Sequence, residues 1–265
     1  MKKIFLAPLL LILFLGFAAA QQNQGRVVYN LTIRLQFSFG GQSTGLEQLL
    51  PASRTVKYEL LFANNQSTWK QKPETEETLP DFGSEGNTMK IVVAGSEDLL
   101  YCNFDTRMKT EKRMLYDKQF LIEDSLSKLT WKLTGETKKI LDHVCVKAES
   151  IRIKKEYITT VEGGTFGKKE VDDTSKIIAW FTTEIPVSAG PSEFQDQLPG
   201  LILELNINEG EQLFSAVSID PLADLSEIKA PAGKKKYTQK QFLKEKEKLA
   251  DEINSRGGNK RIFRM

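Results

Sequence analysis

The chain has 265 residues, a formal net charge of +2 and 40% hydrophobic residues. This length suits one β-rich domain, or at most two small ones, with room for a sizeable core. Only the N-terminus carries a long apolar run, which excludes a membrane protein with several helical spans.

The N-terminal residues 1–20 have the three parts of a secretory signal peptide. Lys2 and Lys3 precede an apolar run that ends at Phe17, and three alanines at 18–20 supply small residues for cleavage. We therefore expect cleavage near Ala20 and an exported protein that is periplasmic or associated with the outer membrane. An uncleaved anchor is the alternative. No nucleic acid partner is expected in that compartment.

Residues 21–228 predict one antiparallel β domain. Its first strand shows the clearest alternation, with apolar side chains at odd positions and polar ones between them. Similar runs recur between turn signals, about eleven strands in all, which favours a curved sheet that is an open barrel or sandwich-like. The candidate runs, twelve by the most generous count, are 27–39, 56–62, 67–70, 89–93, 99–104, 118–122, 129–133, 143–153, 157–161, 177–182, 201–207 and 213–219.

The predicted strand at 143–153 changes its apolar phase. Val144 and Val146 fall on even positions, whereas Ile151 and Ile153 fall on odd ones. A β-bulge near Glu149-Ser150 would reset the phase and turn both isoleucines inward. Glycines at 163, 164 and 167 then predict the tip of a long hairpin.

Residues 229–265 predict a basic linker and a C-terminal helix. Thr238 is a good N-cap with Gln241 three residues later, and Tyr237 and Phe242 occupy the hydrophobic-staple positions. This segment carries 12 basic and 4 acidic residues, while 21–228 is acidic overall. The helix could dock on its own domain or on a partner. The exposed lysines that would contact an anionic surface, such as a membrane, are Lys234, Lys235 and Lys236.

Two cysteines remain, Cys102 and Cys145. In an exported protein an even pair is most simply a disulfide, and both lie in predicted strands. Two buried free thiols are the alternative.

No enzyme motif stands out. His143 is the sole histidine, and there is no Gly-x-Ser-x-Gly, Walker or Gly-x-Gly-x-x-Gly motif. We therefore expect no catalytic residue and no cofactor. Two alternatives stay open. One is a hydrolase that uses carboxylates. The other is a zinc or copper module built on His143 and Cys145, although two ligands are too few for a closed site and no metal site is assigned.

A motif near residue 200 resembles a known family. Its residues are Gln197, Leu198, Pro199, Gly200, Leu201 and Ile202. This hexapeptide is similar to the Gly-Leu-Pro-Gly-Leu-Ile signature of the GLPGLI family, secreted β-rich envelope proteins of Bacteroidota, with Gln in place of the first Gly. Segments at 131–133, 145–148, 179–186, 190–191 and 235–238 also resemble the family. The resemblance implies an envelope location and a β fold but no activity.

The sequence predicts that Pro199 and Gly200 form a type II turn, in which Gly200 has a positive φ, before a core strand. Trp131, Trp180 and Phe181 lie on predicted strands and could line a groove on the concave side of the sheet. The expected function is therefore non-enzymatic. It is the binding of an apolar ligand, an extended peptide or a membrane-associated envelope partner, through the concave side or the basic helix.

Overall fold

The computed structural model describes residues 22–35, 51–72, 98–162, 165–222 and 224–256. Its strands form one 12-stranded sheet in the order β12-β6-β5-β4-β3-β2-β1-β11-β10-β9-β8-β7. Neighbouring strands are antiparallel, except that β12 runs parallel to β6. The predicted class, a mainly β protein with a single curved sheet and a C-terminal helix, is confirmed. The strands are β1 (Gly25–Arg34), β2 (Ser53–Ala63), β3 (Gln66–Gln71), β4 (Leu99–Asn103), β5 (Met108–Leu115), β6 (Lys118–Ser125), β7 (Lys132–Ile140), β8 (His143–Glu162), β9 (Thr165–Thr182), β10 (Leu201–Ile207), β11 (Gln212–Asp220) and β12 (Lys236–Tyr237).

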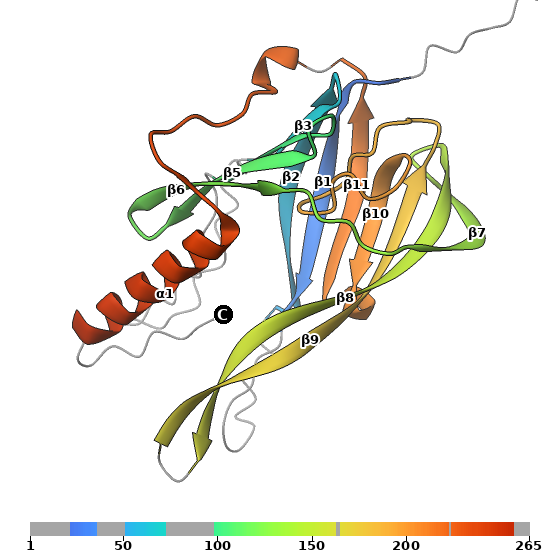
Figure 1. Cartoon of the computed structure of the whole chain (residues 1–265). Coiled ribbons are helices and arrows are strands. Elements are labelled where there is room, and N and C mark those ends of the chain that lie inside the picture. The colour runs from blue at the N-terminus through green and yellow to red at the C-terminus, as the bar shows by residue number, and fades with distance from the viewer. Residues whose placement is uncertain (1–21, 36–50, 73–97, 163–164, 223, 257–265) are drawn as a thin grey trace, which may run out of the picture.

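The sheet curls around its own core. Figure 1 shows the loop between β9 and β10 inside the curve, where Ile185, Phe194 and Leu198 pack against side chains of the strands. The concave face therefore holds the main hydrophobic core, and the convex face looks outward. Tyr29 is fully buried in this core, and its hydroxyl donates to the carbonyl oxygen of Ile202 at 2.6 Å.

The alternation that predicted the first strand is confirmed over its described part. Val27, Tyr29 and Leu31 of β1 are buried, and the residues between them are not. The predicted continuation at 36–39 lies outside the described residues, as do the predicted strand at 89–93 and the signal peptide.

The long hairpin of β8 and β9 is more regular than the sequence suggested. The two predicted strands at 143–153 and 157–161 are one strand, whose register against β9 is continuous from Val146, opposite Phe181, to Glu162, opposite Thr165. The predicted tip glycines at 163 and 164 lie outside the described residues, whereas Gly167 lies within β9, opposite Thr160. The predicted bulge at Glu149-Ser150 is wrong, because the break in register lies in β7.

Four further strands differ from prediction. β9 begins at Thr165 rather than at 177, and β12 was not predicted. β5 was not predicted, because its sequence MKTEKRML is charged on both faces and shows no clean alternation. The strand expected at 129–133 instead begins at Lys132 and runs to Ile140 as β7. Gly135, with a φ of 81°, lies within the break in register, where the backbone leaves the regular strand conformation.

The C-terminal segment passes from one face of the sheet to the other around its β6 edge. Glu227 binds Lys70 at 2.6 Å on the convex face, and β12 then pairs with the edge of β6. Helix α1 (Gln239–Arg256) packs on the concave face, where Phe242 and Phe120 have ring centroids 5.3 Å apart. The helix therefore docks on its own domain, one of the two predicted alternatives (Figure 1).

The predicted cap of this helix is also confirmed. The Gln241 side chain accepts from the Thr238 amide at 2.9 Å, and the Thr238 hydroxyl accepts from the Gln241 amide at 3.3 Å. This is the reciprocal pair of a capping box. Among the described helices, none has the length and apolar character that a bilayer span requires.

Candidate functional site

The most unusual feature of the sheet is the place where β8 and β9 lose their outer neighbours. Pairing of β7 with β8 ends at Glu149, and pairing of β10 with β9 is confined to 177–182. The hairpin nevertheless continues as a two-stranded ribbon to Glu162 and Thr165, and Figure 1 shows it projecting beyond the sheet. No other described strand pairs with either edge of this ribbon, and isolated two-stranded ribbons are only marginally stable in water.

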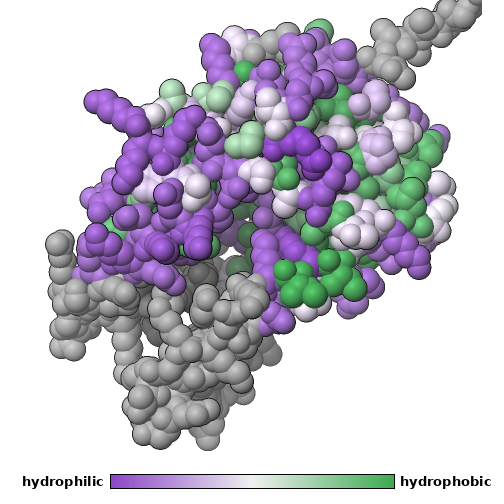
Figure 2. Space-filling model, in the orientation of Figure 1, coloured by the Kyte–Doolittle hydropathy of each residue, from purple (hydrophilic) through white to green (hydrophobic). Residues whose placement is uncertain are grey.

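The ribbon carries two exposed isoleucines at its base. Ile151 is 66% exposed and Ile153 is 64% exposed. Because β8 keeps its register without a bulge, Ser150 turns toward the core, and Ile151 and Ile153 turn to the convex face. Figure 2 shows a hydrophobic patch over this part of β8, beside the residues drawn in grey. Large apolar side chains placed together on a surface commonly mark an interaction site.

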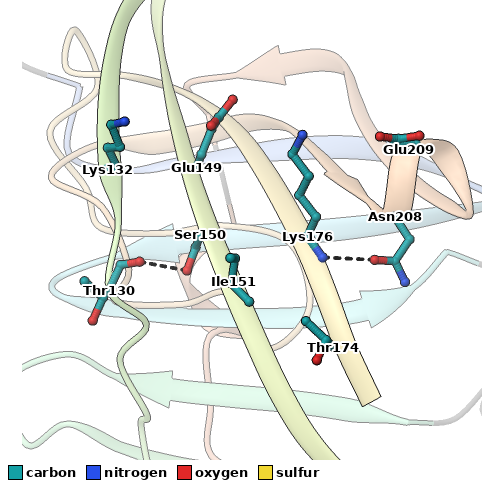
Figure 3. A pocket seen from close by; sticks show the side chains of 9 residues that line it. All are labelled: Thr130, Lys132, Glu149, Ser150, Ile151, Thr174, Lys176, Asn208 and Glu209. Atoms are coloured by element: carbon teal, nitrogen blue, oxygen red, sulfur yellow. Dashed lines mark hydrogen bonds between the residues drawn. The ribbon is translucent and has the colours of Figure 1, made fainter. Parts of the chain in front are cut away.

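A hollow of about 690 Å³ lies beside Ile151. Figure 3 shows Ile151 between β8 and β9, with Lys176 and Thr174 on β9 and Glu149 above it on β8. The hollow is lined by Thr130, Lys132, Glu149, Ser150, Ile151, Thr174, Lys176, Asn208 and Glu209. It therefore combines an apolar centre with a polar and charged rim, the usual arrangement of a binding site.

Backbone and side-chain hydrogen bonds fix the walls of this hollow. Ser150 donates from its hydroxyl to the carbonyl oxygen of Thr130 at 2.8 Å, and Asn208 accepts from the amide of Lys176 at 3.0 Å (Figure 3). Glu149 pairs with Lys147 at 3.1 Å. The walls are thus held by contacts within the protein, while the isoleucine side chains have no cover from the described residues.

Gln197 holds in place the segment 127–131, which contacts β8 as far as Ser150. Its amide oxygen accepts from the Leu129 amide at 3.0 Å, and its amide nitrogen donates to the Ser127 carbonyl at 2.6 Å and to the Gln195 carbonyl at 3.1 Å. These bonds tie residues 127–131 to the corner before β10. Within that segment, the Thr130 carbonyl oxygen accepts from the Ser150 hydroxyl of β8, one residue past the end of the β7 pairing. The residue that departs from the family hexapeptide is therefore structural, and it sits at the border of the open edge.

Gly200 has a role different from the predicted one. Gly200 does not have a positive φ, so the predicted type II turn is wrong. A Cβ at this position would instead lie 2.1 Å from the carbonyl oxygen of Thr182. Glycine is needed because the corner approaches the end of β9 closely. Leu198, Leu201 and Ile202 of the same motif are buried in the core.

The aromatic groove predicted from Trp131, Trp180 and Phe181 is not formed. Adjacent residues of a strand face opposite ways, so Phe181 is buried in the concave core and Trp180 lies on the convex face under Lys138, whose ammonium is 4.4 Å from the ring. Trp131 is half-buried and donates to Gln197 at 3.3 Å. The three rings are packing residues in separate places.

The predicted disulfide is also not found. Cys102 on β4 and Cys145 on β8 are both free and buried, and seven steps of the sheet order separate their strands. Burial raises the pKa of the Cys102 thiol to about 12 and that of Cys145 to about 11. The alternative of two buried free thiols is the one that the structure has.

The structure adds little support for the two alternatives, a metal module at His143 and Cys145 and a hydrolase that uses carboxylates. His143 lies 2.7 Å from Glu184, and Cys145 two residues away is fully buried. Within the described ranges no three His, Cys, Asp or Glu residues cluster as metal ligands. Backbone and side-chain hydrogen bonds, from the Val144 amide and then His143, lower the pKa of Glu184.

The three linker lysines lie on the surface. Lys236 pairs with Glu123, and the ammonium of Lys235 lies 4.5 Å from the centre of the Tyr237 ring. Lys234 is exposed. Two of the three are therefore engaged with the β6 edge region.

Comparison with known proteins finds that part of the chain is similar to a family whose function is unknown. A family profile described as "Protein of unknown function (Porph_ging)" matches residues 131–204, from the start of β7 into β10. A search of curated proteins found no match. A solved structure of PNGF-II in the C2 space group aligns with 86% of this chain at a TM-score of 0.48 and 18% identity, and this chain spans 33% of the PNGF-II chain.

Proposed function

We propose that this is an exported, non-enzymatic envelope protein of the GLPGLI type that binds an extended peptide segment of a partner at the open edge of β8. The observation that carries the proposal is that β8 loses its β7 neighbour after Glu149, next to exposed Ile151 and Ile153. An unpaired strand edge offers backbone donors and acceptors that only another extended chain satisfies in series. An apolar small molecule would fill the hollow but would leave the backbone donors and acceptors of that edge unpaired.

The isoleucines supply the side-chain part of this recognition. A bound strand places every second side chain on the convex face, where alternate apolar residues would cover Ile151 and Ile153. Backbone pairing would give affinity, and the hollow would select the side chain that fills it. The rim holds both Lys176 and Glu149, so the fit favours uncharged over strongly charged peptides.

We propose a non-enzymatic role because the sequence has no recognised nucleophile motif and no phosphate-binding motif. Export rests on the signal-peptide pattern of residues 1–20. The profile match over 131–204 supports the family assignment, because it contains the hexapeptide and the block that begins at Trp131.

A selection of random ten-residue peptides on the purified protein tests the proposal. Selected peptides should alternate apolar and polar residues. Ile151→Asp and Ile153→Asp should each weaken their binding about tenfold or more, because a charge replaces buried apolar contact. Val217→Asp, a matched change at another exposed apolar position, should leave affinity unchanged. Equal binding by all three variants would show that the peptides bind elsewhere and would refute the proposal.

A further inference from the structure

A second, separate site lies on the concave face. A cleft of about 410 Å³ opens there between β2–β5 on one side and Lys154, Ser192 and Glu193 on the other. Gln239, at the start of α1, completes its rim. The cleft is on the face opposite the isoleucines, because Trp69 and Leu100 share the core face of the sheet with Tyr29.

The floor of the cleft is an aromatic stack. Tyr58 lies parallel to Trp69, with centroids 4.9 Å apart and an interplanar angle of 5°. Trp69 is itself held by the edge contact of Phe214 at 6.0 Å and by Tyr29 at 5.4 Å. Tyr58 is half-buried and lines the cleft, so it is the outer ring of a rigid stack. A fixed ring at the surface of a cleft is suited to stacking with a planar group.

Glu193, on the wall opposite β5, is the carboxylate around which cations of the cleft gather. Glu193 is paired with Arg152 and, at 3.0 Å, with Lys154. Burial opposes its ionisation, yet Lys154, Arg152 and Lys109 together hold the pKa of Glu193 below its ordinary value. Three cations therefore surround one carboxylate. The Lys109 backbone lies in the ladder between β4 and β6, but among the described residues its ammonium has no hydrogen bond or ion pair.

The other charged groups of the cleft are already engaged. Glu111 pairs with Arg113, and Asp98 accepts from the amide of Met114 at 2.8 Å. Lys109 is left as the cation that a ligand can use. A partly desolvated lysine without an ion pair binds an anionic group through charge-assisted hydrogen bonds.

We infer that this cleft binds an anionic small molecule with a planar ring, its ring stacked on Tyr58 and its anionic group at Lys109. Carboxylate, sulfonate and phosphate groups share this chemistry. The ring and the charge are both required, because the stack without Lys109 has no anchor and Lys109 without the stack has no selectivity.

Titration with naphthalene-2-carboxylate, followed by protein NMR shifts, tests the inference. The expected result is shifts centred on the Trp69 indole and β5, with affinity reduced about tenfold or more by Lys109→Gln. Lys112→Gln, on the same strand but the opposite face, should have no effect. Neutral 2-naphthalenemethanol and ring-free acetate should each bind more weakly than the naphthoate.

Three outcomes would overturn the inference: unchanged affinity in Lys109→Gln, equal binding of the neutral naphthalene, or shifts confined to residues near Ile151. Tyr58→Leu adds a test of the stack and should weaken naphthoate while leaving acetate unchanged. Since the two sites use different residues, Ile151→Asp should not alter naphthoate affinity, and failure of one proposal leaves the other standing.

Discussion

The amide oxygen of Gln197 lies 3.3 Å from the indole nitrogen of Trp131, so the motif corner before β10 is bonded to the segment that leads into β7. The same side chain forms hydrogen bonds with backbone groups of Ser127, Leu129 and Gln195, so both its donor hydrogens and both its acceptor lone pairs are used. This network sets the position of the chain that covers β8 as far as Ser150. It therefore also sets where the exposed edge begins.

Gln197→Leu should destabilise the fold by about 2–6 kcal/mol, because each of four hydrogen bonds contributes about 0.5–1.5 kcal/mol. The urea midpoint of unfolding measures this loss. Gln119→Leu is the control, since the Gln119 side chain is exposed and makes no hydrogen bond with the described residues. Equal midpoints for the two variants would contradict the structural role given to Gln197.

Gly200→Ala should be strongly destabilising, by roughly 1–3 kcal/mol or more, because the new methyl group would meet a backbone oxygen that cannot move freely. Thermal unfolding measures the change. In Gly233→Ala, the nearest atom is Leu121 Cδ2 at 3.4 Å, an ordinary contact, so this control should retain the melting temperature. A tolerated Gly200→Ala would mean that the corner packs less closely than described.

Both thiols should be inert in the folded protein and reactive once it unfolds. Their raised pKa values leave almost no thiolate at pH 8, and burial blocks access. Because the folded thiols keep protons that the unfolded chain loses near pH 9, their contribution to stability is complete below pH 9 and is lost as the pH rises toward 11 to 12. A Cys102→Ala, Cys145→Ala variant should have a flatter stability curve there. Peptide mapping without reductant that recovers a linked pair would contradict this account.

Phe242→Ala should release α1 from the sheet, with a local cost of roughly 3 kcal/mol, because the Phe242 ring is buried against Phe120. Amide hydrogen exchange along 239–256 should speed up while exchange in β1 and β11 stays slow. Leu243→Ala, at a half-exposed neighbouring position, should change exchange little. Identical exchange in both variants would show that the helix is held by other contacts.

Local patterns in the sequence predicted the elements that depend on neighbours in the chain. The alternation around Tyr29 follows from one buried face, and the capping box at Thr238 needs only residues within one helical turn. Both could therefore be predicted without knowing any tertiary contact.

The predictions that were wrong concern features that depend on distant parts of the chain. Ile151 and Ile153 were expected to turn inward through a bulge near Glu149-Ser150, but β8 keeps its phase and lacks β7 beyond Glu149. An uninterrupted period of two from Ala148 would have placed both isoleucines outside. Likewise, adjacent Trp180 and Phe181 could not have shared one side of a strand, a signal that the sequence did contain.

The cysteine pairing and the role of Gly200 could not be obtained from the sequence. Which strands lie side by side is decided by the order of the sheet, and that order separates Cys102 from Cys145. The contact of Gly200 with Thr182 likewise depends on how the corner folds back onto β9. The aromatic stack of Tyr58 and Trp69 needs the pairing of β2 with β3, which only the structure supplies.

Amide hydrogen exchange in β8, with and without a selected peptide, tests the central proposal most directly. In the free protein, alternate amides within 151–154 point away from β9 and should exchange quickly, because no described strand covers them. Saturating peptide should slow those amides, and Ile151→Asp should reduce this protection at the same peptide concentration. Protection that appears only on the concave face or on α1, with the 151–154 amides unchanged, would contradict strand addition at this edge.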